Sequence, residues 1–584
     1  MKGAGARTGR AEGPCGRGPP WQGPRAARSG AAAAAWLCGA LLAAPAPGQA
    51  QAPATAQARP VVRVPVKRIV LLSRMDEAVA AGAPEEGPAV DVARTPLLAQ
   101  APALERLGRY LGRPIGPETI KGLRLEVMAA YARAGRPFVQ VAVPSQDVSN
   151  GVLQLVVTEG RLGRLSVEGA RRFGEAVYRK ALRQSSGEPI DARRLQADLD
   201  WINRNPYRHA AIVVQPGDRF GVTDLVLNVQ ERRPFSVNAG VDDTGTDSTG
   251  LERLSAGFDW GNAFGRGDDL NYQFQASTDF RALRQHNLSY TAGLPWRHSL
   301  SLSLAYAATR SEDPLGDVGA TGVTRIAAVR YAAPLPRRGP FTHHLAAGFD
   351  FKSTNNDILF GGRSVFPTTS EVDQFLVEYG GQASDRLGGE SFTLTLVGSP
   401  GGLTAHNDDA DFRSQQLGAT ARYVYVRLSA SRTTALPARL VWTAHLTGQL
   451  AGANLLASEQ LVFGGYASVR GFAEQAATRD DGIVVQNEIG PGPLRLDGLA
   501  AALGLPKGSV VVSPFLFLDS GAGRNHHDPE GTGSSSVGLV SAGPGLDLQV
   551  SSHLSGRLTW GSQLHRSGAA GARVPVQFAV RGTF

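Results

Sequence analysis

Few side chains in this sequence are arranged in a way that could do chemistry, and none forms a recognisable catalytic set. His526, His527 and Asp528 are close enough in sequence to hold a metal ion, but they lie in a polar stretch that is typical of a solvated loop. The chain contains no G-x-S-x-G motif, no H-E-x-x-H motif and no glycine-rich phosphate-binding loop. We therefore predict that the protein is not an enzyme, that it has no catalytic residues, and that it uses neither a metal nor another cofactor.

The first fifty residues are typical of a bacterial export signal. A basic, Gly- and Pro-rich stretch leads into Ala31–Ala46, whose apolar part is too short for a mature membrane helix and ends in small residues before Ala50. The alternative is a low-complexity, Ala-rich tail. Both cysteines, Cys15 and Cys38, lie in this segment, so its removal near Ala50 leaves a chain without thiols. Export without disulfides or sulfur-bound zinc indicates the bacterial envelope.

Charge and composition exclude several classes of protein. Five of the nine net positive charges lie within residues 1–50, and no basic stripe follows that could track phosphates, so we expect no nucleic-acid partner. With 42% hydrophobic and 19% charged residues, the chain is too apolar for disorder and too weakly charged for a coiled coil. The sequence also lacks a run of about 20 strongly apolar residues, which argues against a membrane protein built of helices.

Two small α/β modules are predicted after a Pro-, Ala- and Gln-rich linker at residues 51–61. The first, residues 62–160, has the order strand, helix, helix, strand, strand, and the second, residues 161–232, repeats it. Asp191 is a favourable N-cap for the last helix of the second module. The alternative is two unrelated α+β modules. The predicted strands are 62–72, 138–143, 152–158, 161–167, 210–214 and 222–230, and the predicted helices are 95–111, 117–135, 173–184 and one that begins after Asp191.

From residue 234 onward the sequence alternates with a period of two. In one example, Leu300, Leu302, Leu304 and Tyr306 alternate with serines and alanine. Each segment has about the ten residues that a tilted membrane strand needs, with one apolar face and one polar or small face. A soluble sandwich would carry more Lys, Glu and Asp on its outer face. Sixteen segments are predicted to start near Phe235, Leu254, Leu270, Leu288, Leu300, Ile326, Leu345, Phe375, Phe392, Ala419, Leu440, Ile483, Val511, Val537, Leu554 and Val576.

This even number of strands predicts a closed transmembrane β-barrel over residues 234–584. In the last strand, Val576, Phe578, Val580, Gly582 and Phe584 share one face, and the chain ends on Phe584. An aromatic terminus on an alternating strand resembles the assembly signal of bacterial outer-membrane barrels. We therefore assign Phe584 as a C-terminal assembly signal and expect the barrel assembly machinery to be a partner during biogenesis.

Two motifs in the barrel carry a family resemblance. FGGYASVRGF (463–472) lies between the eleventh and twelfth predicted strands, and FLDSG (517–521) lies at the end of the thirteenth. The chain resembles the transporter half of two-partner secretion systems, the haemolysin/haemagglutinin secretion-activation (TpsB) family, over residues 62–584. Further matching segments are YARAGRPFVQVAVPSQDVSNGVLQLVVTEG (131–160), NRNPYRHAAIVVQPGDRFGVTDLVLNVQE (203–231) and DDTGTDSTGLERLSAGFDWGNAFGRGDDL (242–270).

The resemblance implies a fold and a site. The fold is a β-rich membrane protein in which two periplasmic α+β POTRA domains (62–160 and 161–232) precede a 16-stranded transmembrane β-barrel. The loop with the VRGF motif is implied to fold back into the barrel, where Arg470 pairs with Asp519. The implied site residues are Val469, Arg470, Gly471 and Phe472 in the loop and Phe517, Asp519 and Gly521 in the strand motif.

The residue pattern agrees with this placement of Asp519. Alternation puts Asp519 on the face of Phe515 and Phe517, which we assign to the lumen, because a carboxylate facing lipid would be costly whereas a lumenal one can meet a guanidinium. The alternative is that the pair only fixes the loop and has no gating role. The family's plug helix and long linker do not both fit between Ala50 and Val62, so the resemblance does not extend to gating by a plug.

The implied function is type V, two-partner secretion across the outer membrane. The partner is a large TpsA-like exoprotein, recognised in the periplasm through its N-terminal secretion domain, and outer-membrane lipid surrounds the barrel. We predict docking on the edge strand and groove of the second module, at Leu199, Ile202, Ile212 and Val214. The alternative is an outer-membrane protein assembly or insertion factor of the same superfamily.

Overall fold

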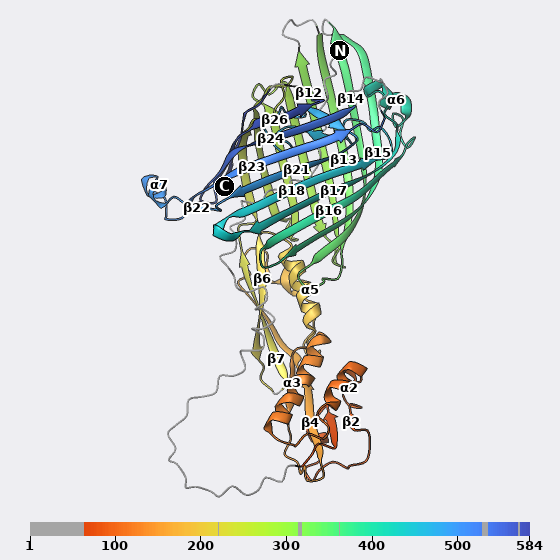
Figure 1. The fold of residues 1–584 in the computed structure, drawn as a ribbon, viewed down its shortest axis with the longest axis vertical. Coiled ribbons are helices and arrows are strands. Elements are labelled where there is room, and N and C mark those ends of the chain that lie inside the picture. Colours follow the sequence, from red (N-terminus) through yellow and green to blue (C-terminus); the bar gives the residue numbers. More distant parts are fainter. Residues whose placement is uncertain are drawn as a thin grey trace. The chain divides into compact units, whose positions relative to one another are not determined.

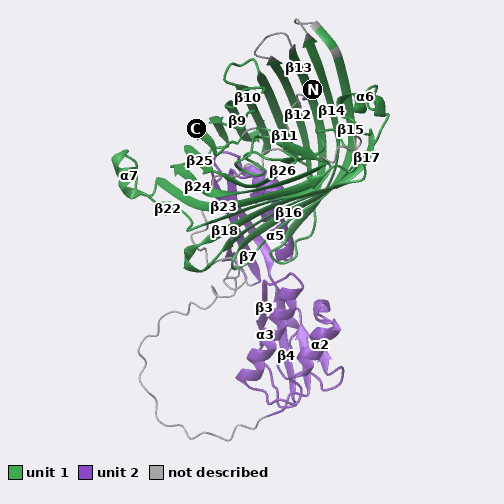
Figure 2. Ribbon diagram, turned by 45° about the horizontal axis from the view of Figure 1, so that its top comes forward, with its two compact units in different colours: residues 1–22, 233–584 green, residues 23–232 purple. Residues whose placement is uncertain are grey.

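A computed structural model of the chain describes residues 64–219, 221–312, 318–360, 363–527, 535–569, 571 and 573–584 (Figure 1). The chain forms two compact units that meet in sequence at Arg232 and Arg233 (Figure 2). The predicted export signal (1–50) and linker (51–61) lie outside the described residues. In the described part of the chain, no helix is long and apolar enough to cross a membrane.

The first module is a four-stranded sheet with two helices. The strand order is β2-β1-β4-β3, with β1 parallel to β2 and β4, and β3 antiparallel to β4. Helix α3 turns Leu123, Val127 and Tyr131 into the core. The elements are β1 (Arg68–Leu72), η1 (Met75–Glu77), β2 (Val90–Asp91), η2 (Pro96–Leu98), α2 (Ala101–Gly108), α3 (Pro117–Arg133), β3 (Val139–Ala142) and β4 (Val152–Glu159).

The second module is a three-stranded sheet in the order β5-β7-β6, which leaves β6 at one edge. Asp191 caps α5 as predicted, because its carboxylate accepts the backbone N–H groups of Arg193 and Arg194. Side chains of both helices and the sheet share one core. The elements are β5 (Arg161–Glu168), α4 (Glu175–Ala181), α5 (Ala192–Asn203), β6 (Arg208–Pro216) and β7 (Val222–Glu231).

Both modules have the predicted order of elements, with two differences. The helix predicted over 95–111 is divided into η2 and α2, because Pro96 and Pro102 each take the first turn of a separate element. The two-residue strand β2 was not predicted, since its pairing with β1 depends on a sheet edge that is distant in sequence.

The unit that contains residues 233–584, green in Figure 2, is a closed antiparallel barrel. Two of its wall strands are interrupted, one between β21 and β22 and one at Gly561 between β25 and β26, so the described wall contains sixteen strands, as predicted. They are β8 (Phe235–Asp242), β9 (Arg253–Ala263), β10 (Asp268–Ser277), β11 (Leu283–Gly293), β12 (Ser299–Glu312), β13 (Val318–Pro334), β14 (Thr342–Phe360), β15 (Arg363–Ser384), β16 (Gly388–Pro400), β17 (Arg422–Ala435), β18 (Val441–Ala451), β21 (Asp481–Gly490) with β22 (Leu494–Arg495), β23 (Val510–Arg524), β24 (Ser536–Val550), β25 (Leu554–Trp560) with β26 (Ser562–Ser567), and β27 (Val576–Thr583).

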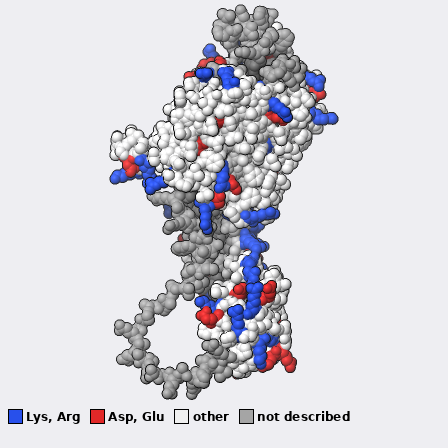
Figure 3. All heavy atoms as spheres, viewed as in Figure 1, with Lys and Arg blue, Asp and Glu red and all other residues white. Residues whose placement is uncertain are grey.

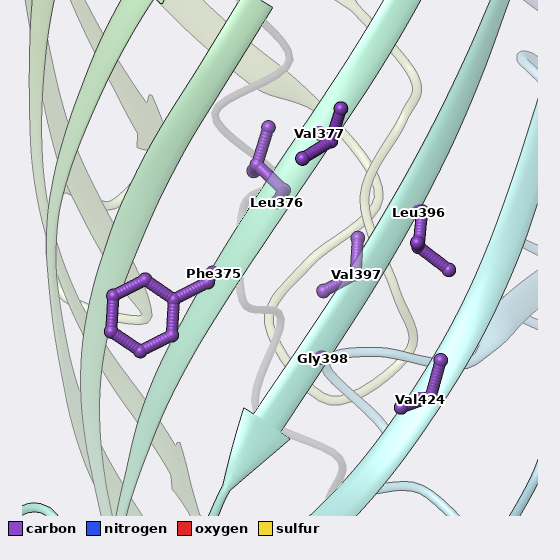
Figure 4. Close-up of a pocket in the computed structure, with 7 residues that line it drawn as sticks. All are labelled: Phe375, Leu376, Val377, Leu396, Val397, Gly398 and Val424. Carbon is purple, nitrogen blue, oxygen red and sulfur yellow. The ribbon is translucent and has the colours of Figure 1, made fainter.

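Apolar side chains face outward along this wall. The alternating set of β12 (Leu300, Leu302, Leu304 and Tyr306) is exposed on the outside of the barrel, as expected for a surface that contacts lipid. A shallow apolar hollow lies on the same outer surface at Gly398, where β16 has no side chain (Figure 4). The outward side chains that line it, Phe375, Val377, Leu396 and Val424, are all apolar, so it belongs to the lipid-facing wall.

Most predicted strand starts lie within a few residues of the observed ones, and two are wrong. β13 begins at Val318 rather than near Ile326, and β15 begins at Arg363 rather than near Phe375. The added residues contain Thr, Ser and Gly, without a continuous apolar face. Strands that continue beyond the lipid need no such face, so the alternation marks only part of each strand.

The last strand closes the barrel against the first. β27 pairs with β8 from Ala579–Asp242 to Thr583–Asn238, and the backbones of Phe584 and Val237 exchange two further hydrogen bonds of 2.8 and 2.9 Å. The Phe584 ring is exposed and stacks on His553. The terminal residue therefore takes part in the wall itself.

Glu231 ties the end of β7 to the segment before α4. Its carboxylate accepts the backbone N–H groups of Arg171 (2.9 Å) and Arg172 (2.5 Å) and the hydroxyl of Tyr178 (2.7 Å). Burial alone would raise the pKa of Glu231, but these donors stabilise its charged form and lower the pKa below its usual value.

We expect Glu231→Ala to destabilise the second module by about 1–3 kcal/mol, because the buried Tyr178 hydroxyl and the backbone N–H groups of Arg171 and Arg172 lose their acceptor. The contribution of Glu231 is complete above its unfolded-state pKa of about 4.3 and is lost as the pH falls through the lower folded-state pKa. Hydrogen exchange of residues 161–232 in the full-length chain, corrected for intrinsic exchange rates at each pH, measures both effects. Glu168→Ala, at an exposed position of β5, is the matched control. Equal protection in the two variants would contradict the role of Glu231.

Candidate functional site

The loop between β18 and β21, residues 452–480, lies inside the barrel and is called the lumen loop below. It contains a small hairpin of β19 (Leu461–Phe463) and β20 (Ala477–Arg479), and the VRGF residues lie between these strands. Val469, Arg470 and Phe472 are almost completely buried. The structure thus places the predicted motif against the inner wall.

Arg470 and Asp519 form a bidentate ion pair. Nε of Arg470 lies 2.6 Å from Oδ2 of Asp519 and Nη2 lies 2.7 Å from Oδ1, while the backbone N–H of Arg470 donates to the same carboxylate at 3.1 Å. The side chains are 2% and 0% exposed, so water does not screen the pair. In β23, Phe515, Phe517 and Asp519 are buried whereas Leu516 and Leu518 are exposed, which confirms that Asp519 faces the lumen.

The other residues of the F-x-D-x-G motif complete the seat for the loop. The guanidinium carbon of Arg470 lies 4.0 Å from the centre of the Phe517 ring, at cation–π distance. At Gly521 an added Cβ would lie 2.9 Å from the Phe463 ring and 3.0 Å from Val469, so glycine leaves the space that the hairpin fills. Phe517 therefore provides a ring that packs on the Arg470 guanidinium, Asp519 provides the opposite charge, and Gly521 leaves space for Phe463 and Val469.

Gly471 makes the closest approach between the loop and the wall. It has a positive φ of 82°, and an added Cβ would lie 3.0 Å from the carbonyl oxygen of Gly561, at the interruption between β25 and β26. The backbone of Gly471 also accepts a hydrogen bond from Gln563 (2.8 Å) and donates one to Gln577 (3.2 Å). Both polar partners come from wall strands near the barrel closure.

The charge network extends beyond the predicted pair. Glu488 of β21 lies 2.6 Å from Arg470 and 2.9 Å from Arg557 of β25, and Arg557 forms a bidentate pair with Asp547 of β24 at 2.5 and 2.7 Å. We did not predict Glu488, Asp547 or Arg557. Their inward positions in alternating strands are the sequence signal that could have indicated them.

A second anchor, at Glu459, holds the lumen loop near its start. The Glu459 carboxylate lies 2.6 Å from Nζ of Lys352 in β14 and accepts the hydroxyl of Tyr425 in β17 at 3.0 Å. Its backbone carbonyl accepts hydrogen bonds from Arg427 (2.8 Å) and Gln449 (3.0 Å). Only 1% of the Glu459 side chain is exposed. β14 lies six wall strands away from β23, so the two anchors fix the loop to distant parts of the wall.

A neighbouring loop adds apolar contacts to this second anchor. Helix α6 (Asp409–Gln415), between β16 and β17, buries Phe412 completely against Leu455 and Leu456 of the lumen loop and against inward side chains of the wall. The sequence pattern did not predict α6, because it is only seven residues long and lies between two strands.

The structure treats the four predicted docking residues of the second module differently. Leu199 of α5 and Ile212 and Val214 of β6 are half-buried along the boundary between this helix and the edge strand. Ile202, in contrast, is completely buried in the module core, so its side chain does not line an accessible groove. Burial of Ile202 follows from the helical spacing with Leu195, which points both side chains at the sheet.

Comparison with known families decides what this architecture is. The model of the haemolysin secretion/activation protein family ShlB/FhaC/HecB matches residues 221–548, and the ShlB-type POTRA domain model matches residues 88–160. The chain belongs to the ShlB/FhaC/HecB family.

Curated relatives and a solved structure agree with this assignment. The chain is 26% identical to the outer membrane transporter CdiB-2 of Burkholderia pseudomallei, over 70% of both chains. It is 22% identical to the heme/hemopexin transporter protein HuxB of Haemophilus influenzae, over 85% of this chain and 83% of that protein. The structure of CdiB from Escherichia coli has the same fold, with a TM-score of 0.72, 21% identity, and 91% and 93% of the two chains covered.

Family membership establishes the function at a coarse level. The protein is an outer-membrane transporter of two-partner secretion, with N-terminal POTRA domains, and it serves a secreted partner exoprotein. Members of this family are transporters and not enzymes. The assignment favours the transporter over the assembly factor that the sequence had left as an alternative.

We expect Asp519→Asn to destabilise the barrel by about 3–5 kcal/mol, because it leaves the buried Arg470 guanidinium without its main partner. The measurement is the temperature at which the detergent-solubilised chain loses its compact, fast-migrating band on a gel. Asp385→Asn is the matched control, since it removes an acid from an exposed pair with Arg432 and should cost about 1 kcal/mol or less. Similar losses for the two variants would refute a special contribution of the lumenal pair.

We expect Lys352→Met to loosen one half of the lumen loop. Glu459 then loses its cation, so hydrogen exchange should speed up at residues 455–460 while residues 469–471, held by Asp519, keep their protection. Hydrogen exchange followed by mass spectrometry of the folded full-length chain measures both segments. If both lost protection equally, the two anchors would be a single unit.

Proposed function

We propose that this transporter captures the N-terminal secretion domain of a large exoprotein with its two periplasmic modules and passes the chain through the barrel when the lumen loop moves aside. The observation that carries the proposal is the lumen loop itself. It occupies the lumen, and its contacts with the wall are polar and built from side chains, rather than a continuous strand ladder. Such contacts can be exchanged for others without unfolding the wall.

The proposed modules are a POTRA domain at residues 62–160 and a second one at residues 161–232. The family match at residues 88–160 supports the first, and the shared order of strand, helix, helix, strand, strand supports the second. We further propose that residues 1–50 direct export, that the barrel spans residues 234–584, and that the exposed Phe584 at the closing strand is the signal read by the assembly machinery.

The second module offers a docking surface of suitable chemistry. β6 is the edge strand of its sheet, so its outer edge can accept a further strand by backbone hydrogen bonding. Leu199, Ile212 and Val214 lie beside that edge and provide apolar contacts for alternate side chains of an added strand. Ile202 supports this surface indirectly, because it holds α5 on the sheet.

The two anchors, Arg470–Asp519 and Lys352–Glu459, suit a loop that closes the lumen when no cargo is bound and opens when cargo enters the barrel. Each is a buried ion pair, and breaking one costs about 3–5 kcal/mol when its partner is left unpaired. The sequence contains no glycine-rich phosphate-binding loop. We therefore assign the free energy for transport to cargo binding in the periplasm and to cargo folding outside the cell. In this proposal, Arg470 and Glu459 act as positioning residues for the loop and do not contact a reacting group.

Deletion of residues 62–232 tests the proposal as a whole. Secretion of the partner exoprotein should be abolished, while the barrel still assembles in the outer membrane and keeps its heat-sensitive gel mobility. The wild-type chain and an empty membrane are the controls. Secretion that survives this deletion would show that capture by the modules is not needed.

The docking surface is tested by two substitutions on opposite faces of β6. Val214→Asp places a charge beside α5, whereas Val213→Asp changes the exposed outer face of the same strand. We expect the first to reduce secretion about tenfold or more, corresponding to about 1.4 kcal/mol of lost binding, and the second to reduce it much less. Hydrogen exchange at residues 161–232 verifies that the second module remains folded in both variants. Equal secretion by the two folded variants would exclude this face of β6 as the docking surface.

A further inference from the structure

One turn at the periplasmic end of the barrel is much longer than the others. The chain enters the barrel from the periplasmic modules at Phe235, so the end of the wall that contains Phe235 is the periplasmic end. Six of the turns at this end contain three to seven residues, whereas the turn between β21 and β23 contains 19, residues 491–509. Short periplasmic turns are the rule in such barrels, and this exception carries its own strand β22 and helix α7 (Asp497–Ala502).

The long turn exposes a row of leucines. Leu494, Leu496, Leu499 and Leu503 are between 38% and 56% exposed, while Ala500 is completely buried and fixes the helix to its own turn. Figure 1 shows α7 beyond the side of the barrel, at the end of β22 and β23. None of these four leucines belongs to a buried apolar cluster of the described residues, so the projecting element presents them at its surface.

The strand register shows on which side of the barrel wall Leu494 lies. Leu494 pairs directly with Val512 of β23, so the two side chains lie on the same face. Because side chains in a strand alternate, Val512 shares its face with Leu516 and Leu518, which are exposed on the outside of the barrel. Leu494, the first leucine of the row, therefore continues the lipid-facing surface of the wall and not the lumenal surface.

Charged side chains border the leucine row. Arg495 follows Leu494 and pairs with Val511, so it lies on the opposite face of β22. Arg495 and Lys507 are exposed, and the Asp497 carboxylate accepts the backbone N–H of Gly508 at 2.7 Å, which closes the turn. Figure 3 shows blue and red side chains beside the white projection on this side of the barrel. An apolar face with basic residues at its border is typical of an element in the membrane interface.

We infer that the turn 491–509 lies in the periplasmic leaflet of the outer membrane, with Leu494, Leu496, Leu499 and Leu503 among the acyl chains and Lys507 at the phospholipid phosphates. The partner of this surface is the lipid that already surrounds the wall, because the register joins Leu494, where the row begins, to the lipid-facing side of that wall. The turn thereby adds a membrane contact that projects sideways from the barrel wall at the level of the headgroups.

Fluorescent labelling of the full-length chain in phospholipid vesicles tests this inference. Single cysteines are introduced as Leu499→Cys, Leu503→Cys and Ala501→Cys in a chain with Cys15→Ser and Cys38→Ser, and each is labelled with an environment-sensitive dye. Vesicles contain phosphatidylethanolamine and phosphatidylglycerol, with or without lipids that carry a quencher near the headgroup. Ala501 is the matched control, because two helical residues place it about 200° from Leu499 and from Leu503 around the axis of α7.

We expect the dyes at positions 499 and 503 to be quenched several-fold more by the lipid-borne quencher than by aqueous iodide, and the dye at position 501 to show the reverse. Folding of each variant is verified by its heat-dependent gel mobility. Equal quenching of all three positions by iodide, with no effect of the lipid quencher, would overturn the inference. Protection of positions 499 and 503 only after the exoprotein is added would also overturn it, since the occupant would then be protein.

Discussion

The arrangement of the barrel interior depends on a bidentate contact between one guanidinium and one carboxylate that water does not reach. A buried ion pair is favourable only when its geometry is good and the remaining polar atoms are satisfied, and Arg470 and Asp519 meet both conditions. The backbone N–H of Arg470 and the Glu488 carboxylate take up much of the remaining hydrogen-bonding capacity, and the Phe517 ring covers one face of the guanidinium. The loop residues around Arg470 are positioned by this contact.

Small residues are as important as charges in this arrangement. Gly521 and Gly471 are placed where a side chain would collide with Phe463 and with the backbone of Gly561, so the loop can approach the wall to van der Waals distance. The second anchor, at Glu459, uses a different solution: a lysine and a tyrosine from separate wall strands bind its carboxylate, and the amide of Gln449 binds its backbone carbonyl. The loop is therefore fixed by specific polar geometry at Glu459, near its start, and at Arg470, between β19 and β20, and apolar packing at Phe412 and Leu455 supports the first of these anchors.

Much of this fold could be predicted from the sequence, because a membrane strand must show lipid one face and the lumen the other. That constraint located all sixteen wall strands. It gave the wrong first residue for β13 and β15, because these strands continue beyond the region that requires an apolar face. The motif resemblance located Arg470 and Asp519. It could not locate Lys352 and Glu459, since their contact joins residues that are 107 apart and has no local pattern. Ile202 was assigned to a surface because helical spacing alone does not distinguish a core face from a groove.

The closure of β27 on β8 has a consequence for how the protein is made. The backbone N–H of Phe578 donates to the carboxylate of Asp243, a residue 335 positions earlier in the chain, and the final residue hydrogen-bonds to Val237. Neither of these two edges of the sheet can be satisfied until β27 has been synthesised and has met β8. During that interval the nascent sheet has two unpaired edges, which are prone to aggregation, and the entropy of so large a loop slows their meeting. A chain that lacks β27 therefore keeps β8 paired with β9 but leaves the other edge of β8 open.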